Sequence, residues 1–226
     1  MNFKLIFVFL AVISIFSACK PENIVDLTPA LQEAEAPEIE RIIINSDKNE
    51  NGVLDLDDII EGARLDVENK SKYKDAYYSG GYPPNDEGVC TDLVWRAFKH
   101  AGYNLKDMID ADIKENISKY PRVNGVPEPN IDFRRVSNHI TFFSRFGTVL
   151  TKEIIPDDLD NLREWQGGDI VTIERPEHVG IISDKRNKKG VPYVIHNMGP
   201  APREEDCLEN WKGKITGHFR YPKQSN

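Results

Sequence analysis

Cysteine is scarce in this chain: Cys19, Cys90 and Cys207 are the three among 226 residues. Neither a CxxC pair nor an HExxH sequence occurs, so the short motifs that commonly hold zinc are absent. An excess of positive charge is also lacking, because the net charge is −8. A surface that binds phosphates needs clustered Lys and Arg, and the sequence therefore argues against nucleic acid as a partner.

The apolar run at the start of the chain, from Leu5 to Phe16, is too short to span a bilayer comfortably. Lys4 precedes it, and small residues lead to Cys19, which is the pattern of an export signal over residues 1–18. The ending FSAC resembles the lipobox of bacterial lipoproteins, which implies a lipid on Cys19 and a protein anchored in the cell envelope, at the outer membrane where a cell has one. An ordinary cleaved signal is the alternative.

The rest of the chain divides into three predicted segments. Residues 19–38 are acidic and interrupted by Pro, with too little apolar content to pack, and are expected to form a flexible tether. Residues 39–75 hold an Asx-rich loop and a first helix, and residues 76–223 form the main domain.

The segment DKNENGVLDLDD has the spacing of an EF-hand calcium loop, with Gly52 at the sharp turn. Its expected ligands are Asp47, Asn49, Asn51, the carbonyl of Val53, Asp55 and Asp58. Asp58 stands where such loops usually carry Glu. The alternative is a turn whose Asx side chains cap the helix that follows.

Apolar spacing predicts helices first and strands later. Helices are expected at 59–67, 90–101, 105–117 and 140–147, where apolar residues recur every three or four positions. Four short β-rich runs follow at 169–174, 178–184, 192–197 and 215–221, as in an antiparallel meander. This order indicates an α+β fold.

Cys90 is expected at a helix N-terminus, where the partial positive charge favours the thiolate. His178 opens a predicted strand directly after a loop, which suits a general base facing a thiol. His196 lies on the next strand, where it is expected to orient His178 as the third member of a triad. A buried, inert cysteine and histidines without catalytic roles are the alternative.

Cys90 and His178 begin two of three linked motifs, which are CTDLV from Cys90, GDIVTI from Gly168 and HVGII from His178. Together they resemble the NlpC-type cell-wall cysteine peptidases of the papain-like superfamily. The resemblance implies a papain-like fold in which Cys90 is the nucleophile, His178 the base and His196 the polar third residue. Asp92 stands where that family often has Gly. More narrowly, these motifs with PNIDFRRV and VIHNMG resemble the domain of unknown function 1287 family, a presumed member of this superfamily.

Three further side chains are candidates for substrate contact. Arg134 and Arg135 have the chemistry to clamp a substrate carboxylate, although Arg pairs also commonly form ion pairs with nearby acids such as Asp132. The Tyr78 hydroxyl is a candidate second donor to an oxyanion, and aromatic packing under the loop is its alternative.

The sequence predicts a monomeric, lipid-anchored amide hydrolase that cleaves peptidoglycan stem peptides through a thioester, without a catalytic cofactor. An acyltransferase would use the same residues. The main alternative is a non-catalytic envelope-binding module in which Cys90 is inert or paired with Cys207 in a disulfide. A third reading is a zinc site formed by Cys90, His178 and His196.

Overall fold

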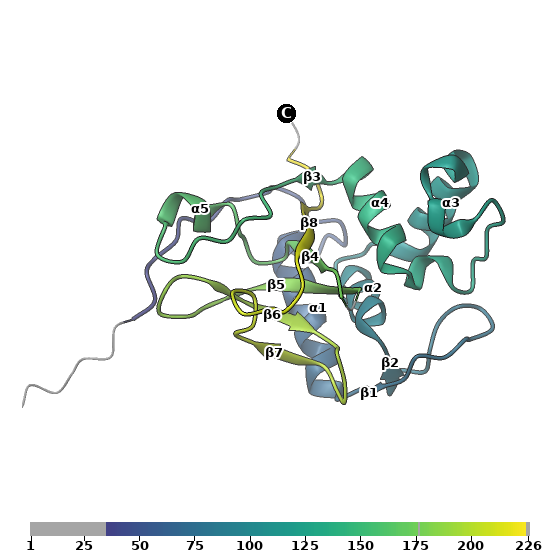
Figure 1. Ribbon diagram of the computed structural model, residues 1–226, viewed down its shortest axis with the longest axis horizontal. Helices are drawn as coiled ribbons and strands as arrows, with labels where there is room; N and C mark the ends of the chain where they lie inside the picture. Colours follow the sequence, from purple (N-terminus) through teal and green to yellow (C-terminus); the bar gives the residue numbers. More distant parts are fainter. Residues whose placement is uncertain (1–34, 176, 225–226) are drawn as a thin grey trace, which may run out of the picture. The chain divides into compact units, whose positions relative to one another are not determined.

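An antiparallel sheet of six strands lies at the centre of the protein (Figure 1). The computed structural model describes residues 35–175 and 177–224, so the predicted signal, Cys19 and most of the tether lie outside the described residues. The strands follow the order β3-β8-β4-β5-β6-β7. Their bounds are β3 Thr148–Val149, β4 Ile170–Ile173, β5 His178–Arg186, β6 Pro192–His196, β7 Arg203–Glu205 and β8 Ile215–Arg220.

Helices follow the order predicted from the apolar spacing. The α-helices are α1 Asp55–Asn69, α2 Cys90–His100, α3 Leu105–Asn116, α4 Val136–Phe146 and α5 Leu159–Arg163. Three short 3-10 helices, η1 Ile117–Lys119, η2 Pro121–Val123 and η3 Asp132–Arg134, lie between α3 and α4. A separate two-stranded parallel sheet joins β1 Lys72–Tyr73 to β2 Glu87–Gly88, just before α2.

The sheet is buried on both faces, and alternate residues of its central strands enter two different hydrophobic clusters. Ile181 and Ile195 pack with α1 and α2 in the larger cluster, whereas Ile182 and Val194 pack with Trp165 in the smaller one. A strand with two buried faces reads as a continuous apolar run, which is how VGII and YVI appear in the sequence.

The predicted α+β class is confirmed, and β4, β5 and β6 form the expected meander. The last predicted strand differs from a simple meander, because β8 returns to pair with β4. The short strand β7 takes the place beside β6 instead. Strands of two or three residues such as β3 and β7 bury too few side chains to leave an alternating pattern in the sequence.

Helix α1 crosses α2 at close range and shares its core, with Ile59 and Ala63 buried in the larger cluster. The contact requires glycine at position 62, because a Cβ there would lie 2.9 Å from the Cα of Ala97 and 2.6 Å from the Cβ of His100. Residues 35–75 thus pack in the same unit as the rest of the described chain. No helix within the described ranges is long and apolar enough to cross a membrane.

Asp169, from the GDIVTI motif, is a fully buried carboxylate that joins two parts of the sheet that are far apart in the sequence. Arg220 of β8 donates to it from Nε and Nη2 at 2.7 Å each, and His218 Nε2 lies 3.0 Å from its Oδ2. The other ring nitrogen of His218 lies 2.7 Å from the carbonyl of Thr151, so the imidazole bridges β8 to the chain after β3. This network gives the GDIVTI motif a structural role, because its Asp169 holds β8 and, through His218, the chain after β3.

We expect Asp169→Asn to reduce the free energy of unfolding by about 3–5 kcal/mol, because it leaves the buried Arg220 guanidinium without its counter-charge. Urea denaturation measures the change. The matched control is Glu40→Gln, which breaks the exposed ion pair with Arg163 and is expected to cost less than about 1 kcal/mol. Equal losses in the two variants would show that Asp169 carries no special structural role.

Candidate active site

Cys90 is the first residue of α2, and its side chain lies against the beginning of β5. The backbone N–H groups of Val179, of Thr91 and of Cys90 itself each favour the thiolate and so act to lower the thiol pKa. Val179 directly follows His178, so a neighbour of the predicted base influences the thiol. The helix start predicted for Cys90 is confirmed.

Burial nevertheless makes the thiolate of Cys90 costly. The side chain is 7% exposed, and desolvation raises its pKa to about 11, with the charge of Asp92 adding to the effect. The sequence-based expectation of a lowered thiol pKa is wrong, because desolvation outweighs the helix N-terminus and the N–H donors. At neutral pH the free protein holds Cys90 as a neutral thiol.

His178 and His196 lie side by side at the start of β5 and the end of β6. Nε2 of His178 is 2.9 Å from Nδ1 of His196, and Nε2 of His196 is 2.9 Å from Oε1 of Glu205 on β7. Both rings contact Trp211, with ring centroids 5.3 and 5.0 Å away. His196 thus lies within hydrogen-bond distance of His178, on the neighbouring strand.

Glu205 fixes the direction of both hydrogen bonds in the row His178–His196–Glu205. Burial opposes its ionisation, but hydrogen bonds from Arg203 and His196 hold its pKa below the ordinary value, so the carboxylate is ionised and can only accept. Nε2 of His196 must then carry the proton, which leaves its Nδ1 as an acceptor. His178 therefore donates from Nε2, and its Nδ1 is left as the free base.

The imidazole of His178 is neutral in this arrangement. Burial, followed by the neighbouring His196, lowers its pKa to about 3. His178 is 3% exposed and His196 fully buried, so little water competes for their hydrogen bonds. A neutral imidazole with a fixed tautomer is the form required of a general base.

Asp92 anchors the start of α2 from inside the protein. Its carboxylate accepts the backbone N–H of Val89 at 2.8 Å and the indole N–H of Trp95 at 3.0 Å. Arg134 donates to both of its oxygens at 2.8 Å, and the side chains of Arg134 and Asp92 are 1% and 0% exposed. A third donor of Arg134 reaches the carbonyl of Ala76.

The structure thus gives other roles to the three residues expected to contact substrate. Arg134 is committed to Asp92 and is not free to clamp a carboxylate. Arg135 donates to the carbonyl of Arg122 and lies 3.4 Å from Asp132, the ion pair that the sequence offered as its alternative. The Tyr78 hydroxyl donates to Glu87 at 2.9 Å, so it is engaged and does not serve as a free oxyanion donor.

Sequence reasoning missed three residues around the site. Glu205 lies on a three-residue strand, and Trp211 lies in a loop that reads as ordinary core-packing sequence. Tyr73 is close enough for the charge of Cys90 to contribute to raising its pKa, after burial. Its backbone N–H donates to the carbonyl of Pro200, which brings the loop after β6 beside β1. The available signal for Glu205 was the run REE, Arg203–Glu205, which follows the strand that carries His196.

Both described cysteines are free thiols. Cys90 belongs to the larger hydrophobic cluster, whereas Cys207 packs against the smaller one on the other face of the sheet. The disulfide that the sequence left open between them is therefore not formed. Asn197, after β6, donates to the carbonyl of Gly88 and ties that loop to the approach to α2.

The Asx-rich loop gathers four of its six expected calcium ligands. Asp47 accepts the backbone N–H groups of Asn51 and Gly52, and the side-chain amides of Asn49 and Asn51 both donate to the buried Asp58. Asp55 is turned elsewhere, because its carboxylate accepts the N–H of Lys48 and the hydroxyl of Tyr103. The backbone N–H of Val53 donates to the side-chain oxygen of Asn51 at 2.7 Å.

A family model described as "Domain of unknown function (DUF1287)" matches residues 60–221. The chain belongs to this family. Uncharacterized protein YijF of Escherichia coli (strain K12) is 37% identical over 172 residues, which cover 72% of this chain and 80% of that protein. All members of the Cys90 and His178–His196–Glu205 arrangement lie within the range matched by the DUF1287 model, whereas the loop from Asp47 to Asp58 precedes it.

We expect native Cys90 to be alkylated by iodoacetamide at least about 100-fold more slowly at pH 7 than in the unfolded chain, because its raised pKa leaves little thiolate. Below the folded pKa the thiolate fraction rises about tenfold per pH unit, and the rate should follow it toward pH 10. Peptide mass spectrometry separates Cys90 from Cys207. A rate that reaches a plateau below pH 8 would show a preformed thiolate and contradict this expectation.

Proposed function

We propose that this member of the DUF1287 family is a cysteine-dependent amide hydrolase, with Cys90 as nucleophile, His178 as general base and His196 as the residue that orients it. The observation that carries the proposal is the fixed order of donors from His178 through His196 to Glu205. That order leaves Nδ1 of His178 unprotonated, on the residue that directly precedes Val179, whose backbone N–H acts to lower the pKa of the Cys90 thiol.

In the proposed reaction, Nδ1 of His178 takes the thiol proton as the sulfur of Cys90 attacks the carbonyl carbon of an amide. The backbone N–H groups at the start of α2 stabilise the oxyanion of the tetrahedral intermediate. The imidazolium then gives its proton to the leaving amine, and a thioester remains on Cys90. Water, deprotonated by His178, attacks the thioester and releases a carboxylic acid and the free thiol.

Transient protonation of His178 is the step that the rest of the chain supports. An imidazolium at this position is costly in the free protein, as the depressed pKa of His178 shows. Its Nε2–H already donates to His196, which donates in turn to the Glu205 carboxylate. Polarisation along these two hydrogen bonds stabilises the positive charge without further rearrangement.

A cavity beside Trp211, the residue that both histidine rings contact, supports the substrate class. It has a volume of about 460 Å³ and is lined by Trp211, by the cations Arg175 and Lys212 and by the acids Glu205 and Asp206. An apolar wall with groups of both charges at its edge fits a short peptide that bears free carboxylates and amines. Peptidoglycan stem peptides have this chemistry, and the export pattern of residues 1–18 would deliver the protein to the envelope as a lipid-anchored enzyme.

A papain-like fold of the NlpC type is part of the same proposal. Its support is the order of elements, with a helix that begins at the nucleophile, followed by an antiparallel sheet whose neighbouring strands carry the two histidines. The polar contacts of Asp92 show how this chain accommodates an acid where the NlpC-type motif often has glycine.

We also propose a structural calcium ion in the loop from Asp47 to Asp58. Asp58 is fully buried, and its donors are the neutral amides of Asn49 and Asn51. A buried carboxylate held by amides is better stabilised by a cation, and a half-turn of each amide would present its oxygen to the ion. Asp55, committed to Tyr103, would contribute at most through water.

We expect the purified protein to release new fragments from peptidoglycan, detected by mass spectrometry. Cys90→Ala should reduce the rate by at least about 10³-fold and His178→Gln by about 10²–10⁴-fold, because nucleophile and base are removed. His100→Gln, a substitution of the same type at the far end of α2, is the matched control and should retain activity. Binding of peptidoglycan without turnover, unaffected by Cys90→Ala, would instead establish a non-catalytic binding module.

Calcium is expected to raise the midpoint of thermal unfolding by about 5–10 °C at a hundredfold excess over its dissociation constant. Asp58→Asn and Asn51→Ala should each abolish most of that shift, whatever their effect on the midpoint in chelator. Differential scanning calorimetry with calcium, magnesium or chelator measures it. A shift that persists in both variants would place the ion elsewhere.

A further inference from the structure

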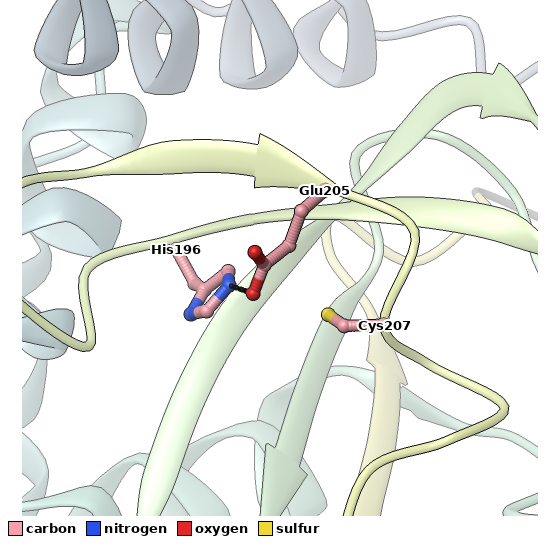
Figure 2. Close-up of side chains that lie close together, drawn as sticks. All are labelled: His196, Glu205 and Cys207. Carbon is pink, nitrogen blue, oxygen red and sulfur yellow. Dashed lines mark hydrogen bonds and ion pairs between the residues drawn. The ribbon is translucent and has the colours of Figure 1, made fainter.

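Cys207 lies beside His196 and Glu205, and its side chain, like theirs, is of a type that binds metals. One ligand atom from each of His196, Glu205 and Cys207 lies within 4.8 Å of the other two. Figure 2 shows the sulfur of Cys207 directed toward the Glu205 carboxylate, which is hydrogen-bonded to His196. Imidazole nitrogen, carboxylate oxygen and thiolate sulfur are the three ligand types that zinc takes in proteins.

The three residues are held in place by partners of their own. The carboxylate of Glu205 is fixed by Arg203 at 2.7 Å, and the far nitrogen of His196 is fixed by His178. A second ring nitrogen held by a neighbour is the usual arrangement around a zinc-bound histidine. Tetrahedral zinc spaces its ligands at about 3.3–3.7 Å. Nε2 of His196 and Oε1 of Glu205, which are 2.9 Å apart, would therefore separate slightly, and no two of the three ligand atoms are more than 4.8 Å apart.

Access and charge also fit a divalent cation. Glu205 and Cys207 both line the cavity of about 460 Å³ beside Trp211, so an ion can enter and a water molecule can complete its coordination. A thiolate and a carboxylate together carry two negative charges, which a divalent cation neutralises. The ion and its three ligands are together neutral, and the Arg203 guanidinium stays paired with Glu205 beside them.

We propose that His196, Glu205 and Cys207 form a zinc site that switches the candidate catalytic base off. The effect on turnover rests on the proposed function, whereas the binding and the change of tautomer do not. Zinc takes the lone pair of His196 Nε2, the position that carries a proton in the metal-free chain. His196 must then donate from Nδ1 to His178, which accepts at Nε2 and carries its proton on Nδ1.

Protons balance in this exchange. Before binding, His178, His196 and Cys207 carry one proton each on Nε2, Nε2 and Sγ. After binding, each imidazole still carries one proton, now on Nδ1, and Cys207 is a thiolate. One proton leaves to solvent for each ion bound, and no oxidation or reduction takes place. The imidazole that offered a free Nδ1 as a base then carries a proton at that atom.

The first test measures zinc alone by isothermal titration calorimetry on the purified chain, in two buffers of different ionisation enthalpy. We expect one ion and about one proton released per chain. Cys207→Ser and Glu205→Gln should each weaken binding at least about tenfold. Cys90→Ser is the matched control and should bind as the wild type does. Circular dichroism establishes that each variant is folded, and Glu205→Gln keeps the test valid if Cys207→Ser is not.

The second test follows the histidine tautomers by ¹⁵N nuclear magnetic resonance, without any substrate. Zinc should move the proton of His178 from Nε2 to Nδ1, and Cys207→Ser should prevent this at the same zinc concentration. Three outcomes would overturn the site. Zinc does not bind, its binding is lost in Cys90→Ser but kept in Cys207→Ser, or its binding is lost only when Asp58 or His100 is replaced. Binding with unchanged tautomers would overturn the switch.

If the proposed function also holds, zinc should inhibit peptidoglycan turnover at least about tenfold, and a chelator should restore it. A protein without turnover that still binds zinc through Cys207 and shifts its tautomers would refute the proposed function alone. A protein with turnover that ignores zinc would refute the switch alone. The two proposals therefore fail separately.

Discussion

The position of the candidate nucleophile depends on one buried ion pair, between Asp92 and Arg134. Asp92 lies one turn into α2 and holds the backbone just before Cys90, while Arg134 connects it to η3 and to the chain before β2. Desolvating two charges is expensive, and the pair is worth its cost only when every donor and acceptor is satisfied. Two ion-pair hydrogen bonds, two N–H donors and a carbonyl meet that condition here, so the helix start is held from three directions.

With the helix fixed, the chemistry is decided by the direction of hydrogen bonds more than by distance. A carboxylate that only accepts, at the end of a row of two imidazoles, leaves one arrangement of their protons. The low dielectric around His178 and His196 strengthens that preference, because both rings are buried. The raised pKa of Cys90 and the lowered pKa of His178 have the same origin in burial, and both keep the resting pair neutral.

The sequence predicted the fold class, the helix that begins at Cys90 and the neighbouring strands that carry His178 and His196, because periodicity and motif spacing report local structure directly. It did not predict the partner of Arg134, since Asp92 and Arg134 are far apart in the chain and either residue alone has many candidate partners. Glu205 was missed for the same reason. The thiol pKa was wrong because desolvation depends on the complete surroundings of a side chain, whereas a helix N-terminus is visible in the sequence.

Glu205 lies on β7, one of the two edge strands of the sheet, which has three residues and is paired along one side only, by β6. Edge strands open with less free energy than interior strands, because fewer buried contacts and hydrogen bonds must break. The group that orders the protons is therefore carried by an edge of the sheet, while the thiol is carried by the buried start of α2. Local opening at β7 would release the tautomer of His196 and leave the nucleophile in place, so the order of protons has a lower thermal threshold than the fold.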